Sequence, residues 1–403
     1  MSLSQETVKD NTLPPAPPGP ILWMRQNLFN SWFNSILSII SILGIYWFLS
    51  SSIRWLFLSA DWRPIVEFPL LFMVGQYPRE QLWRIGLSLA ISTLLIGISW
   101  GVWRNLMGSF AVTIGALLAL AALMPIYMEA ITIEIRGFML FCVILIILGF
   151  LLGRWRKFSG RLVAISWLIA SLLIVLAILP GIANMVKVPT TLWGGLMVTM
   201  ILAIGGIVLS FPIGVLLALG RRSDLPVVKG FSIAFIEGIR GVPLITILFM
   251  FSLILQVFLP VGSRFDRLLR ALIGITIFSA AYMAENVRGG LQAVPPGQIE
   301  AAKAVGMSGF QINLFIVLPQ ALRIVIPAIV GQFISLFKDT TLVIILGINE
   351  LLGIGRAVIN ADPEYVQLQL EVYTFIALVF WIFSYAMSYS SRQLETALGV
   401  GER

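Results

Sequence analysis

Apolar stretches long enough to cross a lipid bilayer recur along most of the chain, and short polar segments separate them. A spanning helix needs about 20 apolar residues, because lipid offers its backbone no hydrogen-bonding partner. Ten stretches approach that length, which predicts an all-α polytopic membrane protein. We expect these helices at residues 33–53, 85–103, 109–127, 137–153, 162–179, 194–220, 233–259, 268–285, 324–346 and 372–391.

The composition agrees with a membrane location. Of the 403 residues, 59% are hydrophobic and only 11% are charged, well below the roughly 25% charged residues of soluble domains. The formal net charge of +8 does not indicate nucleic acid binding, because the basic residues lie at helix ends and form no patch interleaved with aromatic residues. With no His and a single Cys, Cys142, neither a metal site nor a disulfide is expected.

Basic residues near the helix ends indicate the orientation, since loops rich in Lys and Arg stay in the cytoplasm. Ten crossings with both termini inside place residues 154–161, the Arg221–Arg222 pair and the loop around residue 300 on the cytoplasmic side. Five arginines then fall on the outer side, against the rule: Arg79, Arg84, Arg264, Arg267 and Arg270.

The two ends of the chain are expected to be cytoplasmic tails. Residues 1–32 include a proline-rich run at 14–20, so we expect a disordered N-terminal tail. No cleavable signal is predicted, because the first apolar stretch is too long and lacks a cleavage site. Residues 396–403 form the expected C-terminal tail.

A polar loop at residues 288–319 separates two predicted spans and suits a short helix that docks on another protein. We expect residues 298–305 to form about two helical turns, and Gly306, which has no Cβ, to reverse the chain. Ser308 is expected to cap a second short helix that turns its apolar side chains toward the membrane domain. Those side chains are Phe310, Leu314 and Ile316, and Pro319 is expected to keep the next helix from running on.

The motifs of this loop resemble those of importer-type ABC transporter permeases. They are Glu300-Ala301-Ala302, Gly306 six residues after the Glu, and Ile316-Val317-Leu318-Pro319. Residues 193–196 (Trp-Gly-Gly-Leu), 240–244 (Arg-Gly-Val-Pro-Leu), 288–291 (Arg-Gly-Gly-Leu) and 337–342 (Phe-Lys-Asp-Thr-Thr-Leu) resemble the polar amino acid branch, and together they resemble a general or neutral L-amino acid permease. The resemblance covers roughly residues 193–392; the rest matches only in length and hydropathy.

The resemblance implies a type I ABC importer permease core of five helices at 190–395, preceded by about five additional transmembrane helices at 33–185. It implies a permease subunit of an ATP-driven importer of L-amino acids in a bacterial inner membrane. Its implied partners are two ATPase subunits, a second related permease in a heterodimer or homodimer, a periplasmic or extracellular amino acid-binding protein and membrane lipid. It assigns ATPase coupling to Glu300, Ala301, Ala302, Gly306, Ile316, Leu318 and Pro319.

The small side chains of the two alanines would let an ATPase surface approach closely. The chain has no nucleotide-binding loop of the Gly-x-x-x-x-Gly-Lys-Ser/Thr type, because no lysine follows a glycine. We therefore expect a transport subunit that is not an enzyme and binds no cofactor, with ATP and Mg²⁺ held by the partner ATPase.

Four ionisable residues fall within or near predicted spans: Glu237, Arg240, Lys338 and Asp339. Each costs roughly 2.5–3.5 kcal/mol at a bilayer centre, so it needs a partner or water. They either line the substrate pathway, where they meet the two charges of a zwitterion, or hold helices together as structural pairs. Breaks at residues 241–243 and at Pro327 favour a nearby path, because interrupted helices often border one. For Glu285 and Arg288 the structural interpretation is preferred.

Two other functions stay open: an amino acid transporter driven by an ion gradient, and a membrane scaffold that transports nothing. Ion-driven transporters commonly show inverted repeats, which this sequence lacks, and a scaffold has no need of a docking loop.

Overall fold

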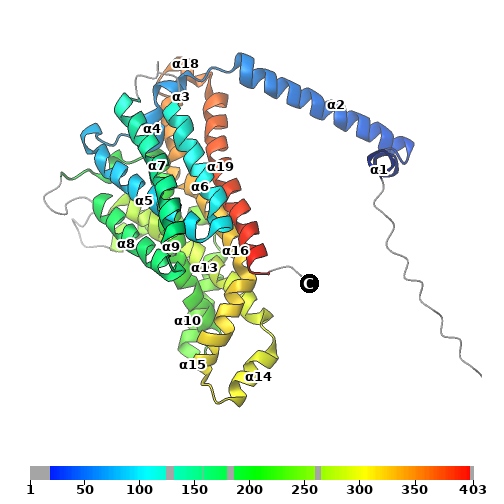
Figure 1. Cartoon of the computed structure of the whole chain (residues 1–403), viewed down its shortest axis with the longest axis vertical. Coiled ribbons are helices and arrows are strands. Elements are labelled where there is room, and N and C mark those ends of the chain that lie inside the picture. The colour runs from blue at the N-terminus through cyan, green and yellow to red at the C-terminus, as the bar shows by residue number, and fades with distance from the viewer. Residues whose placement is uncertain (1–18, 124–130, 157, 179–185, 259–264, 400–403) are drawn as a thin grey trace, which may run out of the picture. The chain divides into compact units, whose positions relative to one another are not determined.

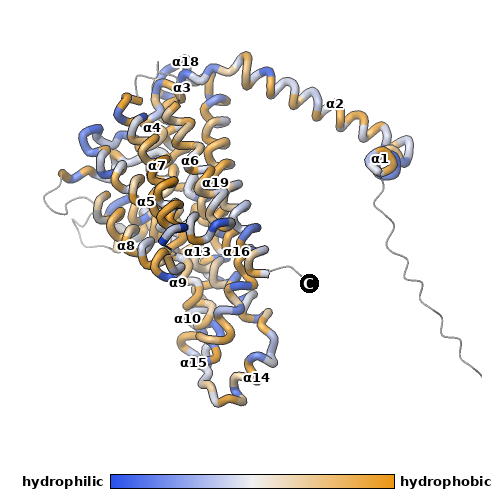
Figure 2. Tube along the Cα trace, viewed as in Figure 1, coloured by the Kyte–Doolittle hydropathy of each residue, from blue (hydrophilic) through white to orange (hydrophobic). Residues whose placement is uncertain are grey.

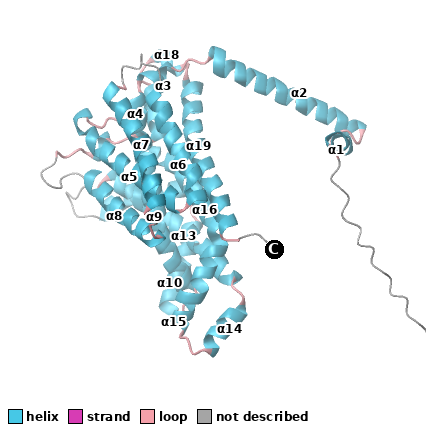
Figure 3. Cartoon of the chain, in the orientation of Figure 1, coloured by secondary structure: helices cyan, strands magenta, loops and turns pink. Residues whose placement is uncertain are grey.

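In the computed structural model, which describes residues 19–123, 131–156, 158–178, 186–258 and 265–399, every regular element is helical (Figure 1). Figure 3 shows these helices joined by short loops. The chain forms two units, Met1–Asp61 and Trp62–Arg403. The expected tail residues 1–18 and 400–403, and the expected span ends at 127, 179 and 259, lie outside the described residues.

The first unit contains α1 (Pro20–Asn27) and α2 (Trp32–Arg54), which continues into the π-helical turn η1 (Trp55–Ser59). Together α2 and η1 form an apolar helix of 28 residues, long enough to span a bilayer. The prediction of disorder up to residue 32 is wrong for α1. Pro20 opens that helix, where its missing N–H and fixed φ suit the first turn.

The second unit begins with α3 (Arg63–Glu67) and α4 (Pro69–Val74), followed by the N-terminal bundle: α5 (Leu82–Val102), α6 (Arg104–Leu123), α7 (Ile133–Trp155) and α8 (Gly160–Ile178). In this bundle α5 and α7 touch through their backbones. A Cβ built on Gly97 would lie 2.2 Å from the carbonyl oxygen of Ile146, and one on Gly153 would lie 2.5 Å from that of Ile98. Small residues permit such close helix packing inside a membrane.

Arginines buried near helix ends bind backbone carbonyls of neighbouring segments. Arg84, which is 0% exposed, donates from Nε to the Ala177 carbonyl (2.8 Å) near the end of α8. Arg136 donates from Nε to the Ile131 carbonyl (3.1 Å), and Arg270 donates to a carbonyl of the π-helical turn η4. Arg84 and Arg270 are two of the arginines whose predicted outer position opposes the rule that basic loops stay in the cytoplasm. Both are buried and connect helices through hydrogen bonds to backbone carbonyls.

The remaining helices form the core, which is arranged around α13 packed between α9 and α16. Its elements are α9 (Gly195–Arg221), α10 (Pro226–Arg240), α11 (Leu244–Phe249), η4 (Met250–Ile254), α12 (Leu255–Phe258), α13 (Arg267–Ala293), α14 (Pro296–Ala304), α15 (Gly309–Gln311), η5 (Ile312–Val317), α16 (Leu318–Asp339), η6 (Thr340–Leu346), α17 (Leu351–Ile359), α18 (Pro363–Val366) and α19 (Gln369–Ala397). Short 3-10 turns η2 (Arg79–Gln81) and η3 (Thr190–Leu192) lie in the connections.

Within the second unit, α14 and α15 lie at one end of the bundle and α3 and α18 at the other (Figure 1). Figure 2 shows hydrophobic residues along most of the long helices and more hydrophilic ones around α3 and α18. At this second end α3 and α18 are joined, since Arg63 pairs with Glu364 at 3.3 Å and the Tyr365 hydroxyl donates to Glu67. The segment before the N-terminal bundle therefore packs on the core.

Among the described residues, eight helices are long and apolar enough to cross a membrane, and two of the ten predicted segments differ from them. The segment at 162–179 is a shorter apolar helix, Gly160–Val175 in the part with described side chains. The segment at 233–259 is bent by 108° between Pro226–Arg240 and Leu244–Ile254. Pro243 explains the break, since it lacks an N–H and disfavours helical backbone at the preceding residue.

Candidate coupling loop and ion-pair cluster

The loop predicted to dock on a partner, residues 288–319, is largely helical. The predicted helix at 298–305 is present as α14 (Pro296–Ala304), and Gly306 then reverses the chain with φ +79°. A Cβ built on Gly306 would have no atom within 4 Å, so the backbone conformation, and not the available space, requires glycine. Ser308 and Gln311 form a reciprocal capping box, with the Ser308 N–H donating to Oε1 of Gln311 at 2.8 Å.

The two alanines of the motif differ in exposure. Ala301 is exposed, whereas Ala302 is 6% exposed and packs among Val294, Ile312 and Val317. Because Ala302 lies inside the loop, the expectation that both alanines face a partner is wrong for this residue. Its small size serves the close approach of α14 to η5.

The outer surface of the loop carries large apolar side chains. Val305 is 77% exposed, Phe310 74% and Phe315 63%, and Leu314 is also exposed. The expectation that Phe310 and Leu314 face the membrane domain is therefore wrong, although Ile316 does pack against the buried cluster. We call Val305, Phe310, Leu314 and Phe315 the apolar docking surface. Sequence reasoning missed Val305 and Phe315, whose only signal was their apolar character in a polar segment.

Pro319 does not separate the loop from the span that follows. One helix of 38 residues runs from Gly309 to Leu346, and its π-helical turn η5 stands just before Pro319. A π turn at this position accommodates the proline, and the Gln320 side chain donates from Nε2 to the Ile316 carbonyl at 2.9 Å. The prediction that the helix stops here is wrong, and the loop is continuous with α16.

Five charged residues from α9, α10 and α13 form an ion-pair cluster: Arg221, Glu237, Arg240, Glu285 and Arg288. Glu285 lies at its centre, where its Oε2 accepts from Nε of Arg288 at 2.9 Å and faces Nη1 of Arg240 at 3.6 Å and of Arg221 at 3.9 Å. Arg221 also pairs with Glu237 at 2.7 Å. Since Glu285 of α13 faces Arg221 of α9 and Arg240 of α10, and Glu237 of α10 pairs with Arg221, the cluster ties α10 to α9 and α13.

The four residues predicted to line a substrate pathway are not gathered in one place. Glu237 and Arg240 belong to the cluster, where each pairs with another helix, and Arg240 also lies 5.5 Å from the ring centre of Tyr282. Asn286, next to Glu285, donates to the Ala328 carbonyl of α16, and Asp339 lies about 16 Å further along that helix. Glu285 and Arg288, for which the structural interpretation is preferred, pair with each other.

Glu350, which sequence reasoning missed, is a buried carboxylate at the opposite end of the core. It caps α17, accepting from the N–H groups of Leu352 and Gly353 at 2.9 Å each. Burial raises its pKa to about 7, although these two N–H groups favour the charged form. The Leu351 N–H donates to Oγ1 of Thr199 at 3.2 Å, so this cap also fixes α17 against α9.

Known proteins resemble the chain along nearly its whole length. Residues 210–399 match the family model of the binding-protein-dependent transport system inner membrane component. The chain is 36% identical over 396 residues to the inner membrane amino-acid ABC transporter permease protein YhdY of Escherichia coli, covering 94% of each chain. It is 36% identical over 418 residues to the glutamate/glutamine/aspartate/asparagine transport system permease protein BztC of Rhodobacter capsulatus, again covering 94% of each.

Among solved structures, the crystal structure of an amino acid ABC transporter with histidines shares 28% identity with the chain. That match covers 50% of this chain and 92% of the other, with a TM-score of 0.46. The similarity to YhdY and BztC extends beyond residues 193–392 and includes the N-terminal bundle.

Proposed function

Because the chain belongs to the family of amino-acid ABC transporter permeases, we propose that it forms half of the membrane pathway of an ATP-driven importer of L-amino acids. It is a multi-pass protein of the bacterial inner membrane and a transport subunit, not an enzyme. Such permeases work with an ATPase and a substrate-binding protein. In our proposal the assembly has two ATPase subunits and a second, related permease, and both termini of this chain are cytoplasmic.

The observation that supports ATPase coupling is the apolar docking surface on an internally packed loop. Exposed aromatic side chains on an otherwise polar loop are unfavourable in water, so we assign this surface to contact with the ATPase. Glu300, Ala301 and Gly306 lie beside it on α14 and its turn. ATP and Mg²⁺ bind to the ATPase alone in this scheme.

Force from the ATPase passes to the spans through rigid packing. Ala302, Ile312 and Val317 join the loop to the buried cluster of α13 and α16, and α16 continues the loop without a break. When the loop moves, α16 and α13 move with it. ATP drives transport only if it binds the two states of the pathway with different affinities.

The substrate path is proposed to pass the bend at residues 241–243. Arg240 lies at the end of α10 beside this bend and belongs to the ion-pair cluster. Because the cluster consists of three arginines, Arg240 included, and two glutamates, it carries an excess positive charge. That charge suits the carboxylate of an amino acid. Glu237, Lys338 and Asp339 are the other proposed pathway residues.

Reconstitution tests this function. The chain is placed in proteoliposomes with its ATPase, second permease and binding protein, and uptake of labelled L-glutamine is measured in competition with L-glutamate, L-aspartate and L-asparagine. We expect uptake that requires ATP hydrolysis. Uptake that follows an imposed ion gradient without ATP would instead support a secondary transporter, and no uptake in any condition would support a scaffold.

A further inference from the structure

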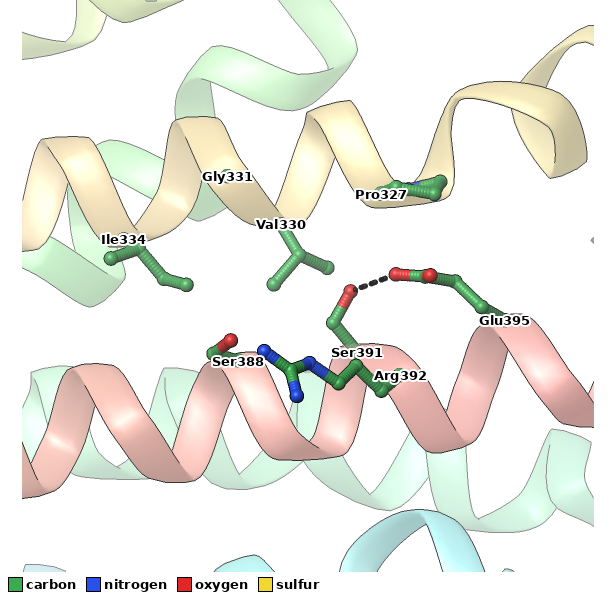
Figure 4. Close-up of a pocket in the computed structure, with 8 residues that line it drawn as sticks. All are labelled: Pro327, Val330, Gly331, Ile334, Ser388, Ser391, Arg392 and Glu395. Atoms are coloured by element: carbon green, nitrogen blue, oxygen red, sulfur yellow. Dashed lines mark hydrogen bonds between the residues drawn. The ribbon is translucent and has the colours of Figure 1, made fainter. Parts of the chain in front are cut away.

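A pocket of about 210 Å³ opens between α16 and α19, nearer the loop end of the bundle. Figure 4 shows its two walls. The wall formed by α16 is apolar and includes Val330 and Gly331. The wall formed by α19 is polar and consists of Ser388, Ser391, Arg392 and Glu395. The pocket uses no residue of the ion-pair cluster. It is smaller than the roughly 300–1,000 Å³ of drug-sized ligand pockets, which suits a small metabolite.

The two charges of this pocket are held apart. Arg392 and Glu395 are three residues apart on one helix, a spacing that permits direct pairing, yet the described residues show no salt bridge between them. Glu395 instead accepts from Oγ of Ser391 through Oε1 at 2.8 Å. The Arg392 guanidinium extends the other way along α19, beside Ser388 (Figure 4). One wall therefore presents a cation and an anion separated by hydroxyl groups.

This arrangement selects a ligand that carries both charges. A guanidinium binds a carboxylate through two parallel hydrogen bonds, and a carboxylate accepts from an ammonium group. An anion alone would be repelled by Glu395, and a cation alone by Arg392. The opposite wall offers contact to an apolar side chain, and the space beside Gly331 is open, because a Cβ built there meets no atom within 4 Å.

We propose that the pocket between α16 and α19 binds a free α-amino acid, with its carboxylate on Arg392 and Ser388 and its ammonium group on Glu395. This inference rests on the proposed function and adds a second location for the solute, distinct from the bend at residues 241–243. Its place near the loop end of the spans makes it a subsite that the amino acid occupies close to release.

Equilibrium binding of tritiated L-glutamine tests the proposal. The purified full chain, without its ATPase, is placed in nanodiscs of phosphatidylcholine and phosphatidylglycerol. We expect saturable binding that weakens by about 10- to 100-fold in Arg392→Gln and in Glu395→Gln, since each loses a charge-assisted hydrogen bond. Arg323→Gln is the matched control, because Arg323 is an exposed arginine of α16 outside the pocket. Gel filtration and thermal melting check that the variants remain folded.

The proposal is overturned if the wild-type chain shows no saturable binding, or if both pocket variants bind like Arg323→Gln. A phosphatidylethanolamine headgroup carries the same two kinds of charge, so native mass spectrometry supplies a second arm. Retention of that lipid by the wild-type chain and its loss in both pocket variants, with no displacement by L-glutamine, would make this a lipid site and overturn the amino acid assignment.

The proposed function fails separately. If ATP-driven uptake by the whole assembly is absent, the importer is rejected whatever the pocket binds. If uptake is present while Arg392→Gln and Glu395→Gln bind and transport normally, only the pocket is rejected.

Discussion

At the scale of single residues, Gly306 shows how backbone conformation governs the coupling loop. Its φ of +79° falls in the left-handed region, which costs an ordinary L-residue about 1–2 kcal/mol and a β-branched one more. Nothing in this chain lies within 4 Å of a Cβ placed there, so within the chain a substitution strains the backbone and causes no clash. Asparagine tolerates this region better than other residues.

We therefore predict that Gly306→Val lowers ATP-driven uptake at least tenfold, because a strain of about 1.4 kcal/mol reduces the population of the native loop conformation about tenfold. Gly306→Asn should retain most of the uptake. Uptake is measured in proteoliposomes at equal amounts of assembled permease. Equal loss in both variants would show that the glycine matters for another reason.

The buried carboxyl group of Glu350 should make the stability of the folded protein depend on pH. Its pKa of about 7 in the folded protein lies above the unfolded value of 4.5, so the folded state binds more protons between these two values. The contribution of Glu350 to the free energy of unfolding is most favourable below pH 4.5. It decreases by about 3 kcal/mol as the pH rises from there through 7. We expect the melting temperature in detergent to fall from pH 5 to pH 8.

The variant Glu350→Gln should flatten this pH dependence and melt above the wild type at pH 8. Glu364→Gln, at an exposed carboxylate of the same end, is the control that keeps the wild-type slope. Parallel melting curves for the wild type and Glu350→Gln would contradict a buried carboxylate that titrates near neutrality.

At the scale of elements, the N-terminal bundle depends on the close contact of α5 and α7. A Cβ at Gly149 would lie 2.4 Å from the Leu94 carbonyl, whereas one at Gly137, on the same helix, would meet nothing within 4 Å. We predict that Gly149→Ile destabilises the folded protein by at least about 1–3 kcal/mol, because the backbones must separate. Gly137→Ile should change it little. Thermal melting compares the two variants. Equal melting temperatures would show that α5 and α7 can separate at little cost, which would contradict the prediction.

The elements also show what the sequence could predict. The spans were predictable because lipid imposes length and hydropathy on each helix separately, and the loop's turn was predictable because Gly306 and Ser308 act locally. The ion-pair cluster was not, since Arg221 and Glu285 meet only after α9 and α13 pack. Nor could the sequence tell that Ala302 faces inward while Ala301 faces out, because that depends on where η5 lies.

The pocket between α16 and α19 escaped sequence reasoning for a related reason. Arg392 and Glu395 are near each other in sequence, but only the hydrogen bond from Ser391 and the opposing wall of α16 reveal a site between them. Pro327, expected to interrupt its helix, lies inside continuous α16 and lines this pocket.

At the scale of the whole molecule, the coupling loop lies at one end of the helix bundle and packs on its core. The buried cluster that includes Ala302, Val317 and Ala321 joins the loop to the spans, and the ion pairs of Glu285 join the spans to one another. A loop connected in this way transmits movement only if an ATPase holds its outer surface. The contact between that surface and the ATPase is the central claim.

Photo-cross-linking tests this contact most directly. A photoreactive phenylalanine analogue replaces Phe310, which is 74% exposed on the docking surface, or Glu364, which is exposed at the opposite end. In the assembled transporter we predict a cross-link to the ATPase from position 310 and none from position 364. Absence of an ATPase cross-link at 310, in assemblies that hydrolyse ATP and import amino acids, would contradict the account.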